Sequence, residues 1–148
     1  MTNPTTFREI PEMVGRKYYS EAFTLTTDDV ERFEQATWSD RALPDGTPAE
    51  YPTDIVEGFY LLSLFDPLSR FAGILDHETT WALNYGGDRV RFVAPIYLGD
   101  RVIPEFEILQ VKPKGAGFLI LERCTLTVEG AARPNVVADW WIFVQARK

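Results

Sequence analysis

The sequence predicts an α+β fold in which one helix packs against a curled antiparallel sheet. Residues 54–71 are apolar around most of a helix circumference, and the chain after Asp76 alternates apolar and polar residues with the period of strands. The length of 148 residues suits one core, since a domain of this size buries roughly two thirds of the surface that its unfolded chain exposes. We therefore expect a single domain over residues 1–148.

The first part of the chain is expected to hold one short strand and one short helix. Residues 1–16 form an irregular arm, because two prolines and a glycine interrupt any periodicity. A strand is expected within residues 18–26. Thr27 then begins a helix, since a threonine cap followed by Asp28 and Asp29 suits the free amides and the positive end of a helix dipole.

A long loop and a buried helix are expected next. Residues 38–53 hold three prolines, a glycine and several acidic side chains, which is typical of a loop, and long loops in compact domains are commonly functional. Residues 54–71 form a helix that is apolar on nearly all sides, so it is expected to be buried, with Asp54 as its cap. Pro67 should kink or end this helix near Asp66.

The rest of the chain is expected to form strands. The turns between them are rich in proline, glycine and lysine, and such short connections imply antiparallel pairing. The expected strands lie at about residues 79–92, 101–111, 117–128 and 136–145.

Composition narrows the classes of function. The formal net charge of −7 argues against binding to nucleic acid or to an anionic membrane surface. One cysteine and one histidine leave no internal disulfide and no zinc cluster, and no apolar run approaches the roughly 20 residues of a membrane helix. We expect a cytoplasmic protein without metal or cofactor. Four tryptophans and ten phenylalanines indicate a large apolar pocket or a subunit interface as well as a core.

Two segments resemble motifs of a known family. Residues 53–64 read TDIVEGFYLLSL, and residues 84–102 read NYGGDRVRFVAPIYLGDRV. Together with the helix of residues 29–37, they resemble the MaoC-like dehydratase family, especially its nodulation protein N branch, over about residues 15–146. The resemblance implies a hot-dog fold, in which the sheet wraps a long central helix. It also implies a homodimer whose two sheets join edge to edge.

The resemblance further implies chemistry, and this chain departs from it. Family members hydrate an enoyl thioester with (R)-specificity, or dehydrate the product, using an Asp and a His five residues later in the loop before the central helix. Those positions hold Ser39 and Pro44 here, so the dyad is missing. A shift of one residue gives Asp40 and Asp45 but no histidine, and the only histidine of the chain is His77.

Carboxylates stand at the positions that changed. The family's His before the helix glycine is Glu57 here, and a common Ser eight residues after that glycine is Asp66. The candidate catalytic residues are therefore Glu57, Asp40 and Asp66, because two carboxylates in different environments can divide acid and base roles. The alternative is that Glu57 faces the helix dipole, that Asp66 caps the turn at Pro67, and that Asp40 is only solvated.

The candidate substrate-binding residues come from the same motifs. The Gly58 amide would hold the thioester oxygen, Ser63 would share the active face of the helix, and Arg91 would contact an anionic group. Ser63 could instead bond back to a helix carbonyl in the core, and Arg91 could pair with acidic neighbours. The full set is Gly58, Tyr60, Ser63, Asn84, Tyr85 and Arg91.

Three functions stay open from the sequence. The first is a lyase-type acid–base catalyst (hydratase, dehydratase, isomerase or cyclase) on an apolar acyl or polyketide-like molecule, for example in secondary metabolism. The second is a non-catalytic hot-dog subunit that binds an apolar ligand or pairs with an active partner. The third is a thioesterase. The sequence does not decide between coenzyme A and a carrier protein.

Overall fold

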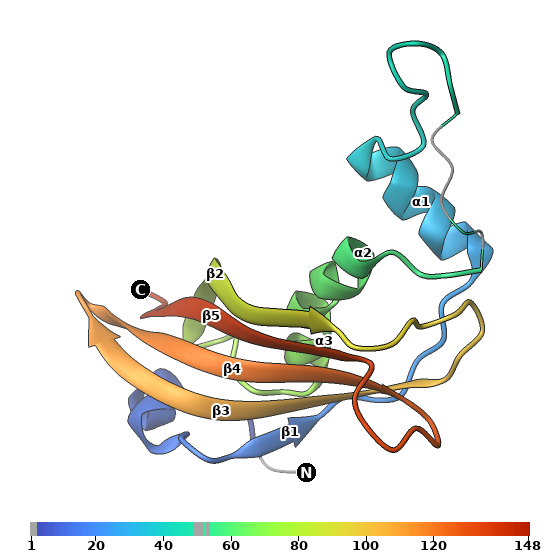
Figure 1. The fold of residues 1–148 in the computed structure, drawn as a ribbon. Coiled ribbons are helices and arrows are strands. Elements are labelled where there is room, and N and C mark those ends of the chain that lie inside the picture. Colours follow the sequence, from blue (N-terminus) through green and yellow to red (C-terminus); the bar gives the residue numbers. More distant parts are fainter. Residues whose placement is uncertain (1–2, 49–51, 53) are drawn as a thin grey trace.

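The fold is a five-stranded antiparallel sheet that curls around two short helices (Figure 1). The computed structural model describes residues 3–48, 52 and 54–148; residues 49–51 and 53 of the expected loop lie outside the described residues. The elements in chain order are the 3-10 helix η1 (Phe7–Glu12), β1 (Lys17–Tyr19), α1 (Thr27–Thr37), α2 (Gly58–Ser63), α3 (Phe65–Phe71), β2 (Thr80–Phe92), β3 (Val102–Lys114), β4 (Gly117–Val128) and β5 (Val136–Ala146).

The sheet has the strand order β1-β3-β4-β5-β2, and every pair is antiparallel. This confirms the predicted fold class and pairing. The four long strands fall where period-two alternation predicted them, and β3 extends to Lys114 because it continues into a tight hairpin with β4. β2 lies at one edge of the sheet and the three-residue β1 lies at the other.

The N-terminal segments differ from their predictions in three places. The arm contains η1, which places Ile10 in the core. Of the strand expected within residues 18–26, only Tyr18 and Tyr19 lie in a strand, the three-residue β1. The helix cap is Thr26 rather than Thr27, because the Thr26 hydroxyl accepts a hydrogen bond from the Asp29 amide while the Asp29 carboxylate accepts one from the Thr26 amide.

The predicted helix of residues 54–71 is broken into α2 and α3 and begins at Gly58, four residues after Asp54. Pro67 explains the break, since it has no amide for the Ser63 carbonyl and its ring would clash with that carbonyl. The prediction that this helix is buried on all sides is also wrong. Leu61, Phe65 and Leu68 are buried, but Phe59 and Phe71 are each 77% exposed.

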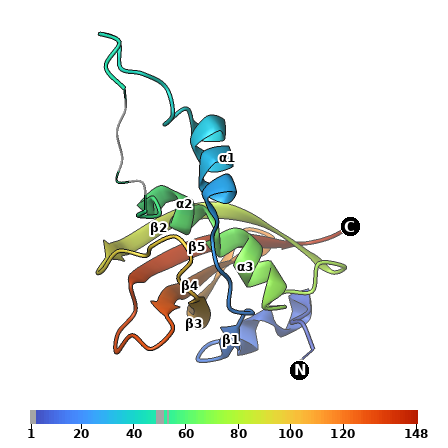
Figure 2. The same ribbon diagram turned by 90° about the vertical axis from the view of Figure 1, so that its right-hand side faces the viewer.

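The core lies between these two helices and the concave face of the sheet. Phe65 of α3 packs edge to face on Phe106 of β3, with the ring centroids 6.5 Å apart. α1 and the loop that follows project away from the sheet (Figure 2). Within the described ranges, no helix has the length and apolar character needed to cross a membrane.

Candidate functional site

The first candidate site is a cavity of about 520 Å³ at the start of α2, here called the Gly58 cavity. The chain before α2 is held in place because the Val56 amide donates to the Ile96 carbonyl at 2.9 Å. A Cβ atom on Gly58 would lie 2.7 Å from ring carbons of Phe92, so a larger residue here would force the Phe92 ring to shift. Its lining is mostly apolar: Ile55, Val56, Glu57, Gly58, Phe59, Leu61, Phe92, Val93, Ala94, Pro95, Ile96 and Val136.

Among the described residues that line the Gly58 cavity, Glu57 is the only one with an acidic side chain. Partial burial raises the pKa of its carboxyl, and the nearby negative charge of Glu34 on α1 raises that pKa further. α1 reaches this position because Phe33 stacks on Tyr60, with the ring centroids 4.6 Å apart. A carboxyl group with a raised pKa beside an apolar cavity is suited to accept and return a proton.

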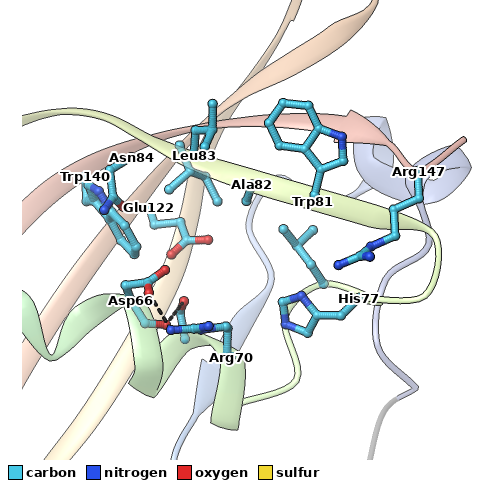
Figure 3. A pocket seen from close by; sticks show the side chains of 13 residues that line it. Asp66, Arg70, His77, Trp81, Ala82, Leu83, Asn84, Glu122, Trp140 and Arg147 are labelled. Carbon is cyan, nitrogen blue, oxygen red and sulfur yellow. Dashed lines mark hydrogen bonds and ion pairs between the residues drawn. The ribbon is translucent and has the colours of Figure 1, made fainter.

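A second cavity, of about 300 Å³, lies between α3 and the sheet and is here called the Glu122 cavity. Glu122 projects from β4 and is 0% exposed, and neither carboxyl oxygen has a hydrogen-bond partner among the described residues. Figure 3 shows Glu122 and Asp66 approaching each other from the sheet and from α3. Burial, and to a lesser degree the charge of Asp66, raises the pKa of Glu122 to about 8.

Asp66 and Asn84, both predicted site residues, line the Glu122 cavity. The Asp66 carboxylate pairs with Arg70 one turn later on α3, at 2.6 Å, so its charge is already balanced. Asp66 therefore does not cap the turn at Pro67, which was the alternative to a role in the site. The remaining lining is Ser69, Leu75, His77, Trp81, Ala82, Leu83, Trp140, Ile142 and Arg147.

A third cavity, of about 500 Å³, lies between the first two and is here called the Tyr85 cavity. Phe59 lines both it and the Gly58 cavity, while Asn84 and Trp140 line both it and the Glu122 cavity. The three cavities therefore form a row along α2, α3 and β2. Ser63 and Tyr85 also line the middle cavity.

The other predicted residues are placed less centrally. The Ser63 hydroxyl donates to the Tyr60 carbonyl at 2.7 Å, as the structural alternative expected. Tyr85 accepts a hydrogen bond from Lys114, and Arg91 donates to the Val90 carbonyl rather than to an acidic neighbour. Asp40 is exposed on the loop beyond α1 and lines none of the three cavities.

Sequence reasoning missed Glu34 and Glu122. Glu34 comes near Glu57 only because α1 docks on α2, a tertiary contact that no local pattern contains. Glu122 did leave a signal: it interrupts the inward-facing apolar series of Ile120, Cys124 and Leu126 on β4.

No family model matches the chain. It is 31% identical to nodulation protein N of Rhizobium leguminosarum bv. viciae, over 93% of this chain and 89% of that protein. It is 32% identical to 3-hydroxyacyl-thioester dehydratase Z of Mycobacterium tuberculosis, over 86% of this chain and 85% of that protein.

A solved structure agrees with these relatives. The MaoC-like dehydratase from Rhodospirillum rubrum superposes with a TM-score of 0.66 at 12% identity, over 91% of this chain and 94% of that chain. The predicted hot-dog fold is thereby confirmed. The chain belongs to the MaoC-like hot-dog family.

Proposed function

We propose that this protein is a hydratase or dehydratase acting on an apolar acyl thioester, with Glu57 as its catalytic acid and base. The observation that carries this proposal is the position of Glu57, whose pKa is raised, beside Gly58 in a largely apolar cavity. The relation to 3-hydroxyacyl-thioester dehydratase Z of Mycobacterium tuberculosis supports the general class of reaction.

In the proposed hydration, ionised Glu57 takes a proton from water as the hydroxyl adds to the β-carbon of the enoyl thioester. Glu57 then delivers that proton to the α-carbon, and dehydration is the reverse. The Gly58 amide, the first of α2 and unused by that helix, holds the thioester oxygen while negative charge develops there. Partial burial and the charge of Glu34 raise the pKa of Glu57, so ionised Glu57 is a stronger base than an exposed glutamate.

Asp40 and Asp66 have different places in this proposal. Asp66 stays paired with Arg70 and shapes the far end of the cavity row, so it binds substrate rather than transferring protons. Asp40 is exposed on the loop beyond α1 and lines none of the three cavities, so the proposed reaction gives it no role.

Purified protein should hydrate enoyl-CoA thioesters, and it should prefer chains longer than crotonyl-CoA because the cavities form a row. Loss of the enoyl absorbance measures the reaction, and product mass separates hydration, which adds one water, from isomerisation, which adds nothing. A thiol reagent reports thioester hydrolysis, which we expect to be absent. Binding of these thioesters without any turnover would instead support the non-catalytic subunit.

We also propose that two copies pair through β2, as the family resemblance implies. β2 pairs with β5 on one side only, among the strands of the described residues, and three of its large apolar residues, Leu83, Tyr85 and Phe92, are exposed, with Leu83 at 54%. Native proteins rarely leave so long an apolar edge uncovered.

Leu83→Lys is therefore expected to convert a dimer into a monomer in sedimentation velocity at micromolar concentration. Ile103→Lys removes an exposed apolar side chain from β3 and should leave the dimer intact. A wild-type protein that sediments as a monomer, or two variants that behave alike, would contradict this interface.

A further inference from the structure

We infer that the Glu122 cavity recognises a neutral oxygen-bearing group, a hydroxyl or a carbonyl, at the far end of an elongated acyl substrate. The inference rests on the proposed function, which places the reacting end of that substrate at Gly58. A plain hydrocarbon tail suits this cavity poorly, because it would leave a buried carboxyl without a hydrogen bond.

Glu122 has a buried carboxyl group without a hydrogen-bond partner among the described residues. Glu122 is 0% exposed, and across the ladder its neighbours are Ile108 on β3 and Trp140 on β5. A buried polar group without a partner costs about 1–3 kcal/mol. In Figure 3 the carboxyl points into the cavity rather than into the sheet. A ligand atom that completes its hydrogen bonding removes this cost.

The charges around the cavity select a neutral ligand. Asp66 is already balanced by Arg70, and Arg147 and His77 line the opposite end of the cavity. A charged ligand group beside Glu122 would find no unbalanced opposite charge among the described residues there, so its burial would be costly. The pKa of Glu122, about 8, leaves its carboxyl protonated at neutral pH, so it offers one donor and one acceptor. A hydroxyl matches both, and a carbonyl matches the donor.

The row of cavities links this group to the reacting end. Neighbouring cavities share lining residues, so the Gly58, Tyr85 and Glu122 cavities adjoin one another. Gly58 and Asp66 are separated by roughly 12 Å along the helical path of α2 and α3. A medium-length acyl chain is long enough to lie with its thioester at one end and its terminal oxygen at the other.

The test compares two saturated probes, the N-acetylcysteamine thioesters of decanoate and of ω-hydroxydecanoate, by isothermal titration calorimetry. Neither probe can be hydrated, so binding is read without catalysis. Wild-type protein should bind the hydroxylated probe about tenfold more tightly, which is the effect of one well-made buried hydrogen bond. Equal affinities, tighter binding of the decanoyl probe, or no binding of either would overturn the inference.

Variants test whether Glu122 is the residue responsible for the preference for the hydroxylated probe. Glu122→Leu should abolish it, whereas Glu122→Gln should keep most of it because the amide still donates and accepts. Glu105→Leu, which changes a partly exposed strand glutamate paired with Lys17, should keep it entirely. A preference that survives in Glu122→Leu would refute the assignment. If that variant does not fold, the wild-type comparison of the two probes still decides.

The two proposals fail separately. Enoyl hydration that depends on Glu57, without discrimination between the probes, would remove only the role of Glu122. Discrimination between the probes without any hydration would remove the proposed reaction and leave a cavity that binds an oxygenated chain.

Discussion

Glu122→Gln is expected to make the protein more stable at pH 8 than the wild type and about equally stable at pH 5. The folded-state pKa of Glu122 is about 8, against an ordinary value of 4.5, so folded protein holds this proton more tightly than unfolded chain does. Its contribution to stability is present below pH 4.5 and is lost as the pH rises toward 8. The loss is on the order of 4 kcal/mol, because one pKa unit corresponds to a little over 1 kcal/mol.

Thermal unfolding over this pH range measures the effect. For a chain of this length, the expected difference in Tm between variant and wild type at pH 8 is roughly 10 °C, shrinking toward zero at pH 5. Glu107→Gln is the matched control, since Glu107 is a half-buried strand glutamate opposite Arg123 rather than in a cavity. If the Tm difference between the wild type and Glu122→Gln were the same at every pH, the claim that buried Glu122 is uncharged at neutral pH would be refuted.

Glu57→Gln is expected to lower kcat for enoyl hydration roughly a hundredfold or more, because the amide can neither accept nor return the proton. Glu34→Gln should act differently: it removes a negative charge that raises the pKa of Glu57. The rate rises with pH as Glu57 ionises, so a lower pKa shifts that rise to lower pH. The Glu34→Gln variant should therefore keep more of its maximal activity in acid than the wild type does.

The pH dependence of kcat/KM separates this role from a merely structural one. Glu31→Gln, an exposed change on the same helix, should leave both the rate and its pH dependence unchanged. A Glu57→Gln variant with nearly wild-type turnover would refute the catalytic assignment. A Glu34→Gln variant with an unshifted profile would show that Glu34 does not act on Glu57.

The strands were predictable because alternation is local: β4 matches its predicted residues from Gly117 to Val128. The helix was harder, since the effect of Pro67 falls one turn earlier, at Ser63, where the sequence looks helical. The motifs around Gly58 identified the family and hence the fold.

The site was less predictable, because its character depends on burial and on contacts between distant segments. Glu57 was found from its motif position, but its pKa depends on its partial burial and on Glu34 of a different helix. Glu122 became unusual only when β5 and α3 enclosed it. The sequence shows where the carboxyl groups are along the chain, whereas packing determines which of them have a raised pKa.

The projection of α1 has a consequence for cooperativity. Most of this helix is exposed, with Val30 its buried residue and the stack of Phe33 on Tyr60 a main contact with the body of the protein. A segment attached so sparingly opens locally at a lower free energy than the sheet unfolds. Amide hydrogens of α1 should exchange well before those of β4. Such an opening would carry Glu34 away from Glu57 and remove the negative charge that helps to raise the pKa of Glu57.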